Sequence, residues 1–284
     1  MKKIITLILT LMLVLTACLG LTACGKKLAM GKEMLKCETQ LDAVVKLVND
    51  DVDAVVIDSI MAGYYQTTGD YAGQIKIVEN VTLAQEEYGI AGRKEDKAFV
   101  SKINEALIAL NAADQIEAVA QTFGVEASLA INDSTTNPLA EANDDSWNQI
   151  VASKKIVIGY TIFAPIAYES AGSLTGFDIE LAKKVVDYLK TTYSVDLTVE
   201  FIVIDWNSKE ALLDNGSIDL VWNGMTITED RLENMCISVP YLYNKQVAVV
   251  KTADVENYTD IASFADAVIG VEKGSAGQSC VEGK

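Results

Sequence analysis

Residues able to bind a small charged molecule follow a predicted strand in the segment WNGMTITEDR, residues 222–231. Gly224 has no side chain, so a ligand can approach the backbone closely there. Thr226 and Thr228 add hydroxyl groups, and the planar guanidinium of Arg231 offers a rigid fork that matches a carboxylate. This spacing indicates a binding site for an anionic group. Arg231 also has a simpler interpretation, as a solvated arginine on the surface of a helix.

An acidic residue and two aromatic residues stand at comparable places. Asp58 ends the apolar run AVVID, Phe163 follows the strand before GYTIFAP, and Trp206 follows another predicted strand. In open α/β sheets, ligands bind at the carboxyl ends of strands. The three residues therefore favour a pocket with an acidic group and aromatic walls. The alternatives are that Asp58 caps the next helix and that both aromatic residues belong to the core.

The composition excludes several other functions. The formal net charge is −17, which argues against binding to nucleic acid or to an anionic membrane surface. The chain has no histidine, the most frequent general base and metal ligand, and its cysteines have no paired spacing typical of zinc sites. We therefore expect no metal, no cofactor and no catalytic centre.

The amino-terminal residues are typical of a bacterial lipoprotein signal. Lys2 and Lys3 precede an apolar stretch, and the pattern Leu-Thr-Ala-Cys occurs twice, ending at Cys18 and at Cys24. We favour lipidation at Cys24, because the polar residues Gly-Lys-Lys follow it, and we expect a signal peptide at residues 1–23. The chain is then anchored by lipid to the extracellular face of the cell membrane. The alternative is an uncleaved transmembrane helix.

The remaining sequence alternates between predicted strands and helices, which indicates an α/β protein. Residues 75–78 and 86–94 read as two separate extended segments, and 96–124 as two helices broken near Asn111. The segment NDSTTNPLAEANDD, residues 132–145, is polar and has no periodicity, so it is predicted to be part of a linker.

Longer motifs resemble a known family. IVIGYTIFAPIAYESAGSLTGFDIELAKKV, IDWNSKEALLDNGSIDLVWNGMTITEDRLENM and SVPYLYNKQVAVV resemble the amino-terminal half of the polar amino-acid-binding proteins. TQLDAVVKLVNDDVDAVVIDSIMAGYY and EEYGIAGRKEDKAFVSKINEAL resemble the carboxy-terminal half. These proteins form solute-binding protein family 3, the extracellular receptors of ABC importers. The resemblance implies the two-lobed type II periplasmic-binding-protein fold.

The two halves stand in the reverse of the family's order. In the family, GVEKGSAGQS leads through a helix into LKCETQLDAVV, whereas here the first lies at the carboxy terminus and the second near the amino terminus. The chain is therefore predicted to be a circular permutant, in which that helix continues in space from Lys284 to residues 26–34. Surface termini that lie close together permit such rearrangement.

This reading divides the chain at defined boundaries. We expect a signal peptide at 1–23, the first part of lobe 2 at 27–84, a hinge strand at 85–92, the last helices of lobe 1 at 93–124, a linker at 125–150, the main part of lobe 1 at 151–243, a second hinge strand at 244–251, and the second part of lobe 2 at 252–284. The chain completes its own lobe 2 as a monomer, or completes that of a second copy in a domain-swapped dimer.

The resemblance also implies residue roles. Arg231 matches the arginine that binds the α-carboxylate of a free amino acid, with backbone amides of Thr226 and Ala276 as further donors. Asp58 matches the carboxylate that pairs with the α-ammonium group. The remaining ligand contacts implied are the Gly224 carbonyl, the Thr226 hydroxyl, the aromatic walls Phe163 and Trp206, and the loop residue Ser275.

Other functions stay open at this point. The same fold supports a few extracellular dehydratases, and a ligand sensor or a decoy lipoprotein without a transport role is a further alternative. The partner implied by the resemblance is an ABC transporter permease. A disulfide between Cys37 and Cys280 is an additional possibility, and Cys236 is expected to be a packed thiol.

Overall fold

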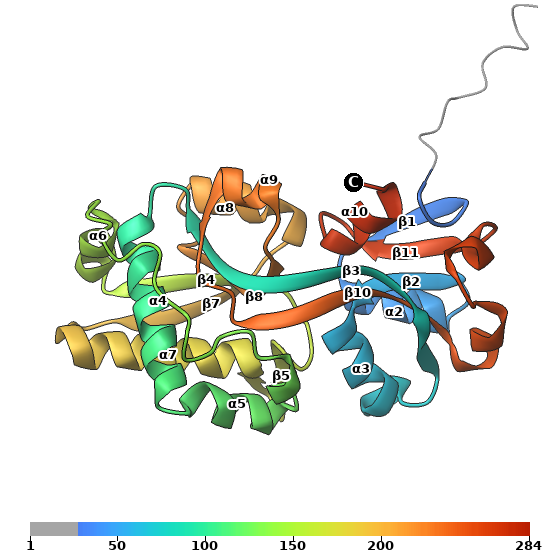
Figure 1. Ribbon diagram of the computed structural model, residues 1–284, viewed down its shortest axis with the longest axis horizontal. Helices are drawn as coiled ribbons and strands as arrows, with labels where there is room; N and C mark the ends of the chain where they lie inside the picture. The colour runs from blue at the N-terminus through green and yellow to red at the C-terminus, as the bar shows by residue number, and fades with distance from the viewer. Residues whose placement is uncertain (1–27) are drawn as a thin grey trace, which may run out of the picture.

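Two long strands, β3 (Ile75–Arg93) and β10 (Leu242–Lys251), run through the middle of the molecule and connect its two lobes (Figure 1). The structure is a computed structural model that describes residues 28–284. The two strands pair antiparallel, with Leu242 opposite Tyr88 at one end and Lys251 opposite Ile75 at the other. They therefore form a paired connection that is shared by both lobes.

Lobe 2 is built from the first and last parts of the described chain. Its strands are β1 (Glu33–Cys37), β2 (Ala54–Asp58) and β11 (Val268–Glu272), and its helices are α2 (Gln40–Val48), α3 (Ser59–Thr67) and α10 (Ala276–Glu282). β1 pairs in parallel with β11, and β11 pairs in parallel with β2. All residues of β2 are buried, as expected for the apolar run Ala-Val-Val-Ile inside a covered sheet.

Lobe 1 contains the middle of the chain. Its strands are β4 (Lys155–Tyr160), β7 (Thr198–Val203), β8 (Leu220–Thr226) and β9 (Met235–Ile237), with a small hairpin of β5 (Tyr168–Ser170) and β6 (Ser173–Thr175). Its helices are α4 (Lys97–Ala112), α5 (Gln115–Phe123), α6 (Ser146–Ser153), α7 (Phe177–Tyr193), α8 (Lys209–Asp214) and α9 (Glu229–Asn234). Aromatic and aliphatic side chains of α4, α5 and α7 pack in its core, among them Phe99, Ile116 and Phe177.

One sheet passes through both lobes. Over the described residues its strand order is β1-β11-β2-β10-β3-β8-β4-β7, and β9 also pairs with β3. The carboxyl ends of β2 and β11 in lobe 2, and of β8 in lobe 1, carry residues that meet at the space between the lobes. The sheet topology thus positions the candidate site.

The predicted two-lobed α/β architecture with two connecting strands is confirmed. The extended segments at 75–78 and 86–94 are one strand, β3, in which residues 82, 84 and 85 also pair with β10 and an irregularity interrupts the register between Ile77 and Thr82. The segment predicted as a linker lies against α4, where the Asn137 amide donates to the carbonyl oxygen of Ser101 at 3.1 Å. Helix α6 begins within the predicted linker range, at Ser146.

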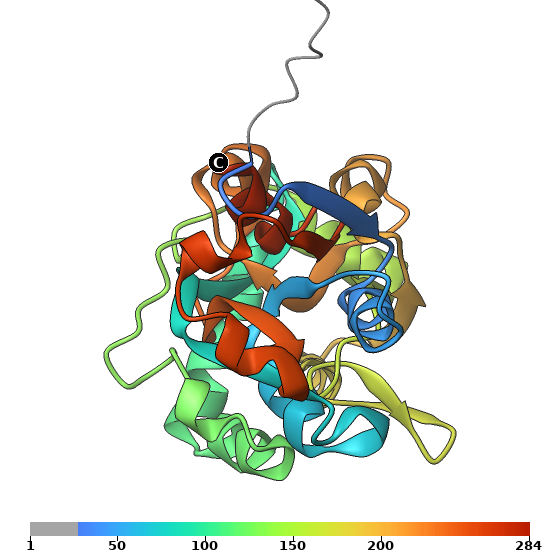
Figure 2. The same cartoon turned by 90° about the vertical axis from the view of Figure 1, so that its right-hand side faces the viewer.

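The prediction of a continuous helix from the carboxy terminus into residues 26–34 is wrong for the described part of that segment. Helix α10 ends at Glu282, because Gly283 adopts a φ of +67° and caps it. Residues 28–32 are not helical, and β1 begins at Glu33 on the free edge of β11. The two segments are nevertheless adjacent: the Ala29 N–H donates to the carbonyl oxygen of Val281 at 2.9 Å (Figure 2).

The predicted signal peptide and the candidate lipidation sites Cys18 and Cys24 lie outside the described residues. Between residues 28 and 284, no helix has the length and apolar character needed to cross a membrane.

Candidate ligand-binding site

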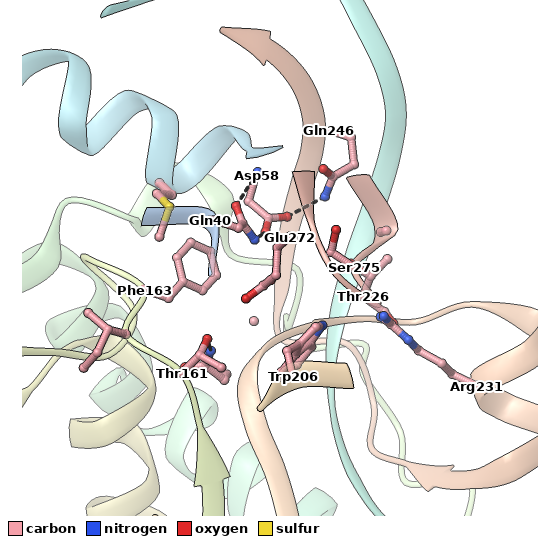
Figure 3. Close-up of a pocket in the computed structure, with 15 residues that line it drawn as sticks. Gln40, Asp58, Thr161, Phe163, Trp206, Thr226, Arg231, Gln246, Glu272 and Ser275 are labelled. Carbon is pink, nitrogen blue, oxygen red and sulfur yellow. Dashed lines mark hydrogen bonds between the residues drawn. The ribbon is translucent and has the colours of Figure 1, made fainter. Parts of the chain in front are cut away.

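All the residues predicted to bind ligand line one cavity between the lobes (Figure 3). They are Phe163, Trp206, Gly224, Thr226 and Arg231 from lobe 1, and Asp58, Ser275 and Ala276 from lobe 2. The cavity volume is about 10 Å³, roughly the space that one water molecule needs. The lobes are therefore closed on each other, and a larger molecule enters this space only when they separate.

Arg231 is held at the end of β8 by local contacts. Its backbone N–H donates to Oγ1 of Thr228, the residue that caps α9, at 3.2 Å. Its Nη1 donates to the carbonyl oxygen of Thr226 at 2.7 Å, and its guanidinium carbon lies 6.0 Å from the ring centre of Trp206. Burial lowers the pKa of Arg231, yet an arginine stays charged in a protein. Within the described part of the chain its hydrogen bonds go to carbonyl oxygens rather than to a carboxylate.

Gly224 is required by its backbone conformation and by its neighbours. Its φ is +60°, in the left-handed region that favours glycine. A Cβ atom at this position would lie 2.6 Å from Cε1 of Phe163 and 3.0 Å from Cε2 of Tyr88. Its N–H donates to Oδ2 of Asp178 at 2.8 Å, and that oxygen also accepts from the Tyr241 hydroxyl at 2.8 Å. The glycine therefore lets the Phe163 ring lie directly against the backbone of the cavity wall.

Asp58 is surrounded by side-chain amides. Its carboxylate accepts hydrogen bonds from Gln40, from Asn244 and, at 2.7 Å, from Gln246. Oε2 of Glu86 accepts from the last two amides at 2.9 and 3.0 Å. Burial, followed by the nearby charge of Glu86, raises the pKa of Asp58. Two carboxylates that share donors in this way favour a cationic group beside them.

Of three other predicted contacts, two have partners within the protein and the third is a backbone amide at a helix start. The Thr226 hydroxyl, expected to help bind an ammonium group, donates to Oε2 of Glu86 at 3.1 Å. Oγ of Ser275 caps α10 by accepting from the Gln278 N–H at 3.1 Å. Ala276 is the first residue of α10, where a backbone N–H has no acceptor within the helix. Its amide is therefore suited to bind an anionic group.

Direct contacts tie the closed lobes together at one loop. The carbonyl oxygen of Gly274, in lobe 2, accepts from Nη2 of Arg231 and from Nζ of Lys209, both at 3.4 Å and both from lobe 1. The Gly274 backbone also lies against Asn207, because a Cβ atom there would be 3.1 Å from the Asn207 Cα. These contacts connect the two sides of the cavity without a ligand.

Several lining residues were not predicted. Glu272 ends β11 and is 3% exposed. The rule that selected Asp58, a carboxylate at the carboxyl end of an apolar strand, also applies to Glu272. Gln40 lies in α2 and Gln246 in β10, and no sequence signal marks either as part of a site. The remaining lining residues are Met61, Thr161, Ile162 and Asn223.

Among residues 28–284, neither the cysteines nor any metal-binding cluster forms part of the site. Cys37, Cys236 and Cys280 are free thiols, so the possible disulfide between Cys37 and Cys280 is absent from the structure. Burial raises the pKa of each thiol to about 11. Within residues 28–284 there is no group of three or more cysteine, aspartate or glutamate side chains arranged to hold a metal ion.

The geometry suits a small molecule with charges of both signs. One side offers a buried guanidinium and helix amide, and the other offers buried carboxylates. An enclosed zwitterion loses its water, so each charge needs a matched partner of this kind. Phe163 and Trp206, 3% and 5% exposed, provide apolar walls for the rest of the molecule.

Comparison with known proteins identifies related sequences for one segment in the carboxy-terminal half of the chain. Residues 156–276 match the model of bacterial extracellular solute-binding proteins, family 3. A probable amino-acid ABC transporter-binding protein of Haemophilus influenzae is 30% identical over 121 residues, covering 42% of this chain and 43% of that protein. The arginine-binding extracellular protein ArtP of Bacillus subtilis is 29% identical over 124 residues, covering 43% and 45%. The chain thus matches less than half the length of these relatives.

Solved structures give matches of similar extent. A substrate-binding protein of an ABC uptake transporter from Streptococcus pneumoniae, with bound histidine, is 38% identical over 32% of this chain and 35% of its own, with a TM-score of 0.27. A polar amino acid ABC uptake transporter substrate-binding protein from Streptococcus thermophilus is 40% identical over 35% and 36%, with a TM-score of 0.27. These TM-scores add nothing to the assignment made from sequence.

Proposed function

We propose, from the premise that residues 156–276 belong to the bacterial extracellular solute-binding proteins of family 3, that this chain binds a free amino acid between its lobes and delivers it to an ABC transporter. The observation that carries the proposal is the convergence of Arg231 and Asp58, from different lobes, on one buried cavity. Relatives named as amino-acid-binding proteins support the same function.

The binding roles follow from the charges. Arg231, with the Ala276 amide, binds the α-carboxylate, and Asp58 receives the α-ammonium group. Because the two charged ends of the ligand contact different lobes, the bound amino acid favours the closed state. The strands β3 and β10 connect the lobes and are the elements that bend when they separate.

To deliver an amino acid to an ABC importer, the protein has to lie outside the cell. A lipid on Cys24 anchors the chain to the extracellular face of the membrane, where both lobes can contact a permease. This part of the proposal rests on the signal-like residues 1–24 and on the role of the relatives as ABC transporter-binding proteins.

We also propose that the chain is a circular permutant that completes its own lobe 2. The match to the family covers residues 156–276, while β1 and β2, encoded far upstream, complete the sheet around β11. The hydrogen bond from Ala29 to Val281 supports a former connection between these segments.

A thermal-shift panel of the twenty common amino acids and cystine tests the binding function. A ligand at 100 times its dissociation constant adds about 2.7 kcal/mol of stability, which raises the melting temperature of a chain of this size by about 5–10 °C. We expect such a shift with one or a few amino acids. A cooperative melt that none of them changes would contradict the proposed function and leave a decoy or a sensor of another ligand.

A further inference from the structure

Glu272 is a buried carboxylate without a matched partner. It ends β11 in lobe 2, is 3% exposed and lines the cavity. Its Oε1 is buried and accepts no hydrogen bond from any of the described residues. Figure 3 shows its carboxylate pointing into the space between Phe163, Thr161 and Trp206. A buried charge in this condition is costly unless a partner arrives.

The protein's own cations are engaged elsewhere. Nζ of Lys209 donates to the carbonyl oxygens of Trp206 and Gly274, at 3.3 and 3.4 Å, and lies 5.0 Å from the ring centre of Trp206. Arg231 donates to carbonyl oxygens and is the partner assigned to the ligand carboxylate. Within residues 28–284 neither cation forms an ion pair with Glu272, and the ion pairs present join other residues, such as Arg93 with Asp96.

The other carboxylates of the site already have hydrogen-bond donors. The amides of Gln40, Asn244 and Gln246 donate to Asp58 and Glu86. Glu272 lines the cavity beside them with a buried oxygen that has no donor among the described residues. A zwitterion with an apolar side chain leaves this oxygen without a partner, whereas a cationic side chain supplies both a donor and the matching charge.

We propose that Glu272 binds the side chain of the ligand and that the site selects cationic amino acids, the class of L-lysine, L-ornithine and L-arginine. The assignment rests on the proposed function, because it places the α-carboxylate at Arg231 and the α-ammonium at Asp58. Phe163 and Trp206 flank the path to Glu272, and their ring faces attract a cation as well as its aliphatic stem.

Protonation of Glu272 gives a second readout. Burial, followed by the charge of Asp58, raises the pKa of Glu272 to about 8, while Lys209, the Gln40 amide and Arg231 oppose the shift. At pH 7 the carboxyl in the free protein therefore carries a proton for much of the time. A cation beside it stabilises the carboxylate, so a cationic side chain bound there releases a proton. Burial and Glu86 also raise the pKa of Asp58, which contacts the α-ammonium of any amino acid, so the proton release due to Glu272 is the excess over that of a neutral amino acid.

The central experiment is calorimetric titration of the whole protein with L-arginine, L-lysine, L-glutamine and L-glutamate, using Glu272→Gln and the matched control Glu87→Gln. Glu87 is exposed on β3, so its variant removes the same charge without touching the cavity. We expect the wild type to bind a cationic amino acid at least about 30-fold more tightly than L-glutamine. Glu272→Gln should lose that preference, and Glu87→Gln should keep it.

Repeating the wild-type titration in two buffers with different ionisation enthalpies measures the proton release, and it does so even where a variant fails to fold. A larger release at pH 7 with the cationic amino acid than with L-glutamine supports the assignment. Equal binding of neutral and cationic amino acids, or equal proton release by both, overturns it while the proposed function stands. If no amino acid binds the wild type, both fail.

Discussion

At the scale of single residues, the cleft holds carboxylates in two different conditions. Asp58 and Glu86 share the amides of Asn244 and Gln246, so their oxygens have donors before any ligand arrives. Glu272 has a buried oxygen without one. This difference separates carboxylates whose oxygens already have donors within the protein from a carboxylate whose buried oxygen a ligand can supply with one.

The raised pKa of Glu272 predicts a pH dependence of stability. Burial raises its pKa from 4.5 to about 8, so between these values the folded chain keeps a proton that the unfolded chain releases. Stability from this group therefore falls as the pH rises from 4.5 to 8, with a slope of at most about 1.4 kcal/mol per pH unit. Glu272→Gln should have a flatter profile in chemical denaturation across this range than Glu87→Gln. Identical slopes in both variants would show that Glu272 ionises normally.

The sequence predicts some of these residues and not others. Asp58 ends the apolar strand β2 and Arg231 lies in the helix that follows β8, and the carboxyl ends of strands converge on one edge of a sheet. Gln40 and Gln246 could not be predicted in this way. They are ordinary polar residues in a helix and a connecting strand, and only the three-dimensional pairing brings both amides to Asp58.

At the scale of elements, Gly224 within β8 lets the Phe163 ring pack against the backbone of that strand. We predict that Gly224→Ala destabilises the protein by about 1–3 kcal/mol more than Gly172→Ala. Both glycines have positive φ values, +60° and +76°, and so incur backbone strain, but only Gly224 has Phe163 and Tyr88 within contact of an added Cβ atom. Equal losses of stability in urea denaturation would mean that strain alone, and not the packing of Phe163, requires the glycine.

The sequence predicts element boundaries well where hydrophobic periodicity is strong. It predicts them poorly where pairing with a distant strand determines whether a segment is extended. The apolar run before Asp58 forms β2 as expected. β3 could not be seen as one strand, because its middle, at residues 79–87, contains charged and exposed residues. Pairing with β10 keeps that segment extended. Similarly, β1 forms because β11 offers an open edge, a feature absent from the local sequence.

At the scale of the whole molecule, the proposed permutation predicts that the original order of segments also folds. A chain running from 142 to 284, then through a short Gly/Ser linker into 28–141, should melt within a few degrees of the natural chain and keep its ligand preference. The new joint is short, because the Ala29 N–H lies 2.9 Å from the Val281 carbonyl oxygen.

In the matched control, the same joined chain has its new termini inside α4, between Leu107 and Ile108. This variant should fold poorly, because both residues pack against the core. If the reordered chain is unfolded while the natural chain binds ligand, the permutation is contradicted.

The most direct measurement is calorimetric titration of the wild type, Arg231→Ala and Arg93→Ala with the amino acid that gives the largest thermal shift. Arg93 is also in lobe 1 and is paired with Asp96 at 2.8 Å, away from the cavity. We predict one amino acid bound per chain, affinity lowered by about 2–5 kcal/mol in Arg231→Ala, and little change in Arg93→Ala. Arg231→Ala binding as tightly as the wild type would contradict a ligand held between the lobes at this site.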